Sequence, residues 1–150
     1  MRTLFTALVA LCYVGSPAQA QEFTPVYVAT EDDDDTCEVS NVSIVAVVES
    51  ELRYNRIPVG TRAQAIADEA LTLRVNTTAV FNRGVCAVGY NLEMSNYQEI
   101  VLSVTGEKRW ATTVLCQKGG LMTGPAFDLQ SRLNAEFRDL ASQCISQYLK

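Results

Sequence analysis

The stretch LTLRVNTTAVFNRGVCAVGYNLEM, residues 71–94, alternates apolar and polar side chains on either side of a short polar segment. Successive side chains of a β-strand point to opposite faces, so this alternation predicts two strands, each with one dry face and one wet face. Asn82, Arg83 and Gly84 separate the two runs, and Gly84 can adopt the positive φ that a three-residue hairpin turn needs. The stretch therefore predicts an antiparallel hairpin that is buried on one face.

The alternation continues for two further runs. Apolar residues recur at every second position over 100–104, and the segment TGEK at 105–108 supplies a second turn. The fourth predicted strand is expected to place four side chains on its apolar face: Trp110, Thr112, Val114 and Cys116. We therefore expect an antiparallel meander over 71–116. A sheet that is apolar on one face must be covered there by another element.

The segment that follows Pro125 predicts a long helix that can supply this cover. Proline suits the first turn of a helix, where its missing N–H costs no hydrogen bond. An apolar stripe then recurs at helical spacing, which indicates an amphipathic helix: Leu129, Leu133, Phe137, Leu140, Cys144 and Tyr148. A short helix is expected near 61–71, since Thr61 and Gln64 fit a capping box.

One more strand is predicted near 39–48, because this segment is rich in β-branched side chains and reads as buried on both faces. Residues 49–60 and 117–124 are expected to form loops, the first broken by Pro58 and the second by Gly119-Gly120. The predicted fold class is α+β. It has an antiparallel sheet of about five strands, covered on one face by the long C-terminal helix and the short helix.

The N-terminal part of the chain predicts export. Residues 1–20 combine a basic start, a short apolar stretch and the cleavage pattern Ala18-Gln19-Ala20, as a secretory signal does. The apolar stretch is too short to cross a bilayer, and no other segment approaches that length, so we expect no membrane insertion. Residues 21–36 are expected to form an acidic flexible arm, and 37–150 a single domain in the periplasm or outside the cell.

The charge of the chain limits the classes of partner that it is expected to bind. The net charge is −5 and no extended basic run is present, which argues against nucleic acid and anionic membranes and suits a protein partner, including a cationic one. One interpretation of the acidic run Glu31–Asp35 is a calcium site. A calcium loop spaces its ligands around a glycine, which this run lacks, so a solvated arm is the simpler interpretation. We expect no metal and no cofactor.

The cysteines predict disulfides. Cys12 falls in the signal, which leaves Cys37, Cys86, Cys116 and Cys144, an even number at wide spacing, as is typical of an exported domain. Four cysteines allow three pairings. We favour Cys116 with Cys144, which would pin the last helix to the last strand, and hence Cys37 with Cys86. Zinc ligation is disfavoured because C-x-x-C pairs and histidines are both lacking.

The composition argues against enzymatic catalysis. The chain contains no histidine, which removes Ser-His-Asp and Cys-His mechanisms. Carboxylates such as Asp68 and Glu69 keep acid/base chemistry formally open, although adjacent acids more often lie on the surface. We therefore expect a non-enzymatic protein.

Two binding functions remain after this exclusion. In the first, the domain recognises a protein partner, and Arg53, Tyr54 and Arg56 are the candidate contact residues because arginine and tyrosine are enriched at interface hot spots. In the second, a cavity between the sheet and the last helix carries a small apolar ligand. Three aromatic residues could line that cavity or fill the core, and core filling is the simpler interpretation: Tyr90, Trp110 and Phe137.

Two asparagines match a glycosylation pattern. Asn41 and Asn76 each begin an Asn-x-Ser/Thr pattern, the acceptor for N-glycosylation in eukaryotic secretion. The sequence does not reveal which kind of cell produces the chain, nor does it specify an oligomeric state.

Overall fold

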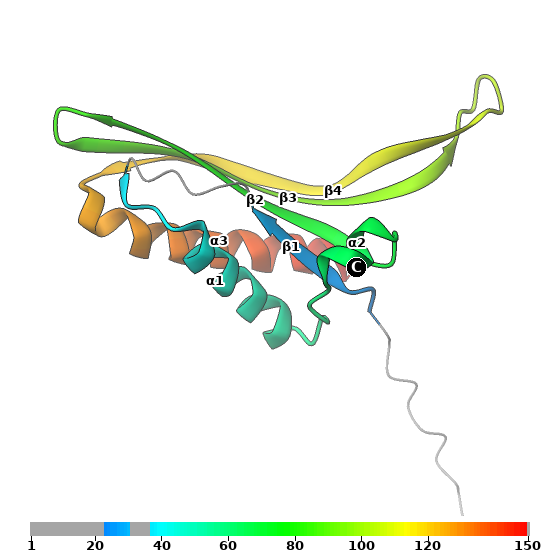
Figure 1. The fold of residues 1–150 in the computed structure, drawn as a ribbon, viewed down its shortest axis with the longest axis horizontal. Coiled ribbons are helices and arrows are strands. Elements are labelled where there is room, and N and C mark those ends of the chain that lie inside the picture. The colour runs from blue at the N-terminus through cyan, green and yellow to red at the C-terminus, as the bar shows by residue number, and fades with distance from the viewer. Residues whose placement is uncertain (1–22, 31–36, 150) are drawn as a thin grey trace, which may run out of the picture.

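A four-stranded mixed sheet with helices packed on one face forms the body of the molecule (Figure 1). The computed structural model describes residues 23–30 and 37–149. Strands lie in the order β1 (Val26–Thr30), β2 (Leu71–Asn82), β3 (Val85–Val101) and β4 (Lys108–Gly124). The fold is α+β, as predicted. The sheet, however, is not purely antiparallel, because β1 runs parallel to β2.

The predicted strand near 39–48 is wrong, since these residues begin helix α1 (Asn41–Tyr54). The Ser40 hydroxyl caps this helix by accepting the N–H of Ser43. Its buried residues, Asn41, Ile44, Val48 and Leu52, recur every three or four positions. A β-branched run fits a buried strand or a buried helix, and only the continuation of this spacing to Leu52 distinguishes the two.

A strand that the sequence analysis did not anticipate lies upstream of α1. Residues 26–30, which were placed in the acidic arm, form β1, and Val26 and Val28 are buried in the core. Val26 pairs with Leu71 at the start of β2. Parallel neighbours need a crossover, and α1 supplies it. The predicted signal and the acidic run Asp32–Asp35 lie outside the described residues.

The meander consists of three long strands and not four short ones. β2 follows the prediction, but β3 continues without a break through residues 95–98, which were expected to form a link. β4 likewise extends through the predicted loop at 117–124. The β3–β4 register shifts beside Met94, which pairs with Cys116 whereas Ser95 pairs with Val114, so Leu115 is the extra residue of a β-bulge.

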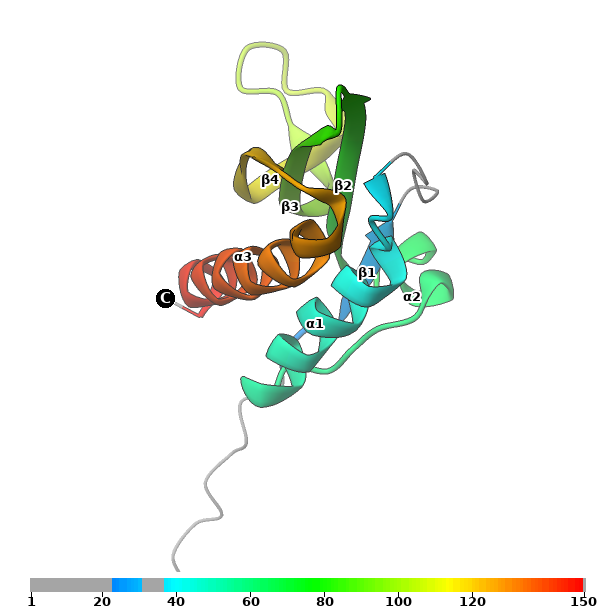
Figure 2. The ribbon, with the colours of Figure 1, turned by 90° about the vertical axis from the view of Figure 1, so that its left-hand side faces the viewer.

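The helix-facing side of the sheet is covered by two helices, α1 and α3 (Ala126–Tyr148), which lie side by side beneath the strands (Figure 2). The amphipathic stripe of α3 is buried as predicted, with Tyr148 partly so. The short helix α2 (Arg62–Ile66) has the predicted Thr61–Gln64 capping box, yet none of its residues is buried. The second covering helix is therefore α1, whose residues were expected to form a strand and a loop.

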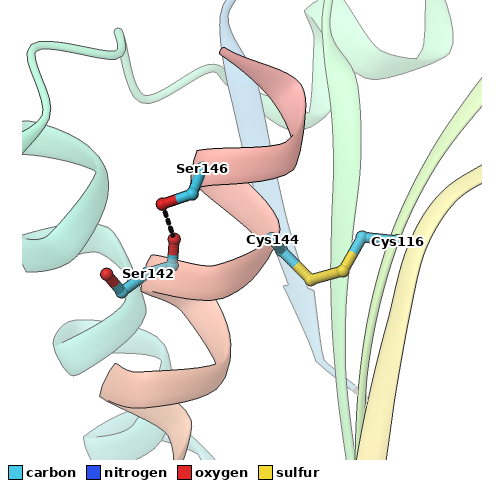
Figure 3. Close-up of a disulfide and its surroundings, with 4 residues drawn as sticks. All are labelled: Cys116, Ser142, Cys144 and Ser146. Carbon is cyan, nitrogen blue, oxygen red and sulfur yellow. Dashed lines mark hydrogen bonds between the residues drawn. A yellow bond between two sulfur atoms is a disulfide. The ribbon is translucent and has the colours of Figure 1, made fainter. Parts of the chain in front are cut away.

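Two disulfides join the layers of the fold. Cys37 bonds Cys86, with 5.9 Å between the Cα atoms, and ties the segment before α1 to the start of β3. Cys116 bonds Cys144, with 5.5 Å between the Cα atoms, and ties β4 to α3 (Figure 3). These are the two pairings that the sequence analysis favoured. Among residues 23–30 and 37–149, no helix has the combination of length and apolar character that crossing a bilayer requires.

Candidate interaction surface

The β3–β4 hairpin extends beyond the rest of the sheet. Pairing of β2 with β3 reaches only as far as Thr72 and Ser95, so residues 96–101 of β3 have β4 as their sole neighbour in the sheet. Residues 96–101 and 108–113, here called the distal ribbon, project away from the helices as the arm that carries the yellow-green turn in Figure 1. A two-stranded ribbon of this kind gains little stability on its own, so the side chains on its faces are informative about its role.

The register assigns each side chain of the distal ribbon to one of two faces. Directly opposed residues share a face, and residues two apart along a strand share it too. Glu99 pairs with Trp110 and Tyr97 with Thr112, whereas Ile100 pairs with Arg109. One face, here called the aromatic face, consists of Tyr97, Glu99, Val101, Lys108, Trp110 and Thr112. The other, here called the amide face, consists of Asn96, Gln98, Ile100, Arg109, Ala111 and Thr113.

The aromatic face is the side of the ribbon that continues the uncovered face of the sheet. Met94 is fully buried against the helices, and alternation along β3 places Tyr97 on the opposite side. The rings of Tyr97 and Trp110 stack with their centroids 5.4 Å apart and their planes 21° from parallel. Tyr97 is nevertheless 51% exposed, Trp110 57% and Val101 63%. Single exposed apolar side chains are ordinary, but a contiguous group on one face indicates an interaction site.

The charged side chains of the ribbon form ion pairs with neighbours in the ribbon or in its turn. On the aromatic face the Lys108 ammonium lies 3.1 Å from a Glu99 carboxylate oxygen. The guanidinium of Arg109, on the amide face, lies 3.0 Å from the Glu107 carboxylate. Exposed pairs of this kind contribute at most about 1 kcal/mol to stability. Their main consequence is a surface that is locally neutral in a chain whose net charge is −5.

The amide face differs in character from the aromatic face. Gln98 donates its side-chain N–H to the Thr113 hydroxyl at 3.2 Å, and Asn96 donates to the Gln98 carbonyl oxygen at 3.4 Å. The first of these bonds crosses from β3 to β4 and the second lies within β3, and such polar pairs stabilise a ribbon without requiring a partner. The two faces therefore present an internally bonded polar surface on one side and an apolar, aromatic one on the other.

The base of the ribbon is held to the body of the protein. The bulge residue Leu115 precedes Cys116, whose disulfide to Cys144 joins β4 to the buried stripe of α3 (Figure 3). Bulges bend a strand and increase its twist, which accounts for the change of direction where the ribbon leaves the sheet. The disulfide fixes the strand immediately beside that bend.

The bulge also explains why the position of Trp110 was predicted incorrectly. Unbroken alternation would place Trp110, Thr112 and Val114 on the same face as Cys116, toward the helices. The extra residue at Leu115 reverses the alternation, so Val114 pairs with Ser95 and Trp110 faces solvent. An exposed aromatic pair was therefore missed. Neither strand's own pattern signals this change of face, which depends on the register between β3 and β4.

The contact residues proposed from sequence lie elsewhere on the molecule. Arg53, Tyr54 and Arg56 cluster at the C-terminal end of α1, on the helix side of the sheet. The Arg53 guanidinium is 2.7 Å from the Glu49 carboxylate one helical turn earlier. Tyr54 is 83% exposed, and Arg56 has a positive φ of 60°. The structure does not bring these three residues together with the distal ribbon.

The interface between the sheet and the helices is filled by side chains. Tyr90 packs on Phe137 with 5.8 Å between the ring centroids, and Leu92, Leu133 and Phe137 are fully buried. No cavity opens in the described part of the chain. A carrier function would require this packed layer to separate.

Metal-binding side chains do not converge anywhere in the described residues. No group of three or more histidine, cysteine, aspartate or glutamate side chains is placed there to hold a metal ion. The pKa of Tyr90 is raised by burial of its hydroxyl, by the nearby charge of Glu136 and by a hydrogen bond to that carboxylate. Both side chains are only partly buried, and the pair links the sheet to α3.

No family model matches the chain, and no curated protein matches it in sequence. Two similar solved structures are PelC dodecamers from Paraburkholderia phytofirmans, one of them of a point variant. The point variant is 17% identical and has a TM-score of 0.42, and the match covers 84% of this chain and 88% of that one. The other is 18% identical with a TM-score of 0.41, over 85% and 90%. Likenesses at this level carry no argument about function.

Proposed function

We propose that this chain is a non-enzymatic, exported binding domain whose protein partner docks on the aromatic face of the distal ribbon. The observation that carries the proposal is the stacked pair of Tyr97 and Trp110, which stays half exposed on a ribbon that no element among residues 23–30 and 37–149 covers. The export part of the proposal rests on the signal-like residues 1–20 and is supported by the two disulfides.

The chemistry of the pair suits recognition of a protein. Tryptophan and tyrosine are enriched at interface hot spots, because each presents a large apolar ring with a polar group at its edge. Two rings that already stack lose little conformational freedom when a partner covers them. Covering them would also supply the apolar contacts that the two-stranded ribbon lacks on that face.

Net charge acts on the partner at long range, whereas the local surface of the aromatic face acts on it in the complex. The net charge of −5 would steer a cationic protein toward the molecule and quicken association. At the aromatic face itself, however, Glu99 and Lys108 already balance one another. We therefore infer that apolar fit at Tyr97 and Trp110 decides the affinity, and that salt changes it little.

Site-specific photocrosslinking in cells that export the chain tests this proposal. A photoreactive amino acid is placed at Thr112, which is exposed on the aromatic face, or at Gln98, which is exposed on the amide face. We expect protein adducts from position 112 and few from position 98. Equal yields from both positions, or none from position 112, would refute the proposal.

A further inference from the structure

We infer that the partner which covers the aromatic face is a second copy of this chain, related to the first by a twofold axis. The inference rests on the proposed function, because it names the occupant of the same face. It assigns to each ribbon the role of both receptor and ligand, as the isologous interface of a symmetric dimer requires.

The charges on the aromatic face are self-complementary. Glu99 and Lys108 lie on it side by side, 3.1 Å apart. A twofold axis that runs within the interface, midway between these two residues, exchanges their positions. It therefore sets Glu99 of each copy against Lys108 of the other, at two symmetric points. A face with one acid and one base thus matches a second copy of itself, whereas a face with a single sign of charge would repel one.

Elsewhere the net charge opposes self-association. A chain with a net charge of −5 repels its own copy in general, and like-charge contacts suppress association. On the aromatic face this repulsion is absent, because Lys108 balances Glu99. The locally neutral aromatic face is also where the stacked rings of Tyr97 and Trp110 are exposed.

The apolar side chains supply the attraction between the copies. Val101 and Trp110 lie on the other diagonal of the Glu99–Lys108 group, so the same axis would bring each of them close to its symmetry mate, and Tyr97 extends the contact by stacking on Trp110. Two sheets that pack face to face bury alternate side chains in this manner. The helices lie on the other side of the sheet and the ribbon projects beyond them, so no helix covers the aromatic face in the described part of the chain (Figures 1 and 2).

The chain contains its own reporter for this contact. Trp110 is its single tryptophan, so the intrinsic fluorescence of the protein reports the environment of the aromatic face. Sedimentation should show a monomer that converts to a dimer as concentration rises, and Trp110 emission should shift to shorter wavelength over the same range. A monomer up to about 1 mM, or a dimer whose formation leaves Trp110 emission unchanged, would overturn the inference.

Charge reversal provides a test in which an unfolded variant would not give the expected result. Glu99→Lys alone and Lys108→Glu alone should each weaken dimerisation by about tenfold or more, because each sets like charges against one another at both symmetric points. An equimolar mixture of the two variants should form heterodimers, in which every reversed charge meets its opposite. Arg109→Glu is the matched control, since it makes the same change one residue away on the amide face, and it should leave dimerisation within about twofold.

The possible results separate this inference from the proposed function. Failure of the mixed variants to form heterodimers, or an equal effect of Arg109→Glu, would overturn it. If photocrosslinks from position 112 join only a different protein, the second copy is wrong and the proposed function stands. Emission that responds to phosphatidylcholine vesicles, but not to protein concentration, would overturn both, because a lipid surface would then be the occupant.

Discussion

Tyr90 on β3 lies directly opposite Gly120 on β4, and its phenol occupies the space that a side chain at position 120 would fill. A Cβ added at Gly120 would lie 2.7 Å from the Tyr90 hydroxyl oxygen. The ring of Tyr90 rests on Phe137, and its hydroxyl donates a hydrogen bond to the Glu136 carboxylate of α3. Because Gly120 has no side chain, the Tyr90 side chain can cross over β4 and form its hydrogen bond with Glu136 of α3.

Gly120→Ala should destabilise the protein by about 1–3 kcal/mol, because the added methyl group displaces a tyrosine that is held by Phe137 and Glu136. Gly89→Ala is the matched control. It lies on the neighbouring strand, and a Cβ there would come no closer than 3.8 Å to the Thr78 carbonyl oxygen. Urea denaturation of the two variants should separate them, and an equal loss in both would show that the Tyr90 contact is unimportant.

Alkaline pH should weaken the fold through Tyr90. Burial, followed by the charge of Glu136 and the hydrogen bond to it, raises the pKa of this hydroxyl above its ordinary value of 10.0. Between the unfolded and folded pKa values the unfolded chain binds fewer protons, so the free energy of unfolding falls as pH rises above about 10. Tyr90→Phe should be less stable at neutral pH and show a shallower alkaline decline. A decline as steep as that of the unaltered chain would contradict this assignment.

A partly buried hydrogen bond joins α1 to β2. Thr77 donates its hydroxyl to the Asn41 side-chain oxygen at 2.8 Å, and Asn41 is almost fully buried. Thr77→Val keeps the shape but removes the donor, so it should cost about 1–3 kcal/mol in the free energy of unfolding. Thr78→Val makes the same change at the next, exposed position and should be nearly neutral. Thermal denaturation of the pair tests this, and similar losses would argue against the bond.

The sequence predicted elements best where one periodicity was unambiguous. The stripe from Leu129 to Cys144 has helical spacing and β2 alternates cleanly, and both are found as expected. The segment that begins at Asn41 was ambiguous, because its valines and isoleucine satisfy a strand and a helix equally well over eight residues. Parallel pairing of β1 with β2 is set by the crossover through α1, so an error in α1 also concealed β1.

Prediction of the candidate site failed because of a single extra residue in β4, Leu115. The alternation that predicted β4 was correct on each side of Leu115, but the bulge there changes the face to which Trp110 belongs. A bulge is specified by how two strands pair and leaves no signature in the pattern of either strand alone. The exposed aromatic pair could therefore be recognised only once the register was known, whereas Arg53, Tyr54 and Arg56 were recognisable as an exposed cluster from composition.

The two disulfides should differ in what their removal does to the distal ribbon. Cys116→Ala with Cys144→Ala, and Cys37→Ala with Cys86→Ala, each open a loop of the chain, with sequence separations of 28 and 49. Each double variant should lose about 2–4 kcal/mol of stability. The first pair alone holds β4 to α3 beside the Leu115 bulge, so only its removal should free the base of the ribbon.

Hydrogen exchange measured under native conditions separates the two effects. Amides of residues 96–101 and 108–115 should exchange faster in the Cys116→Ala, Cys144→Ala variant than in the other double variant once both are compared at matched global stability, for example at different urea concentrations. Because Trp110 lies on this ribbon, acrylamide should also quench its fluorescence more strongly in the first variant only. Equal protection of the ribbon in both variants would mean that the β3–β4 pairing alone determines its rigidity and that the Cys116–Cys144 bond stabilises the fold without positioning the aromatic face.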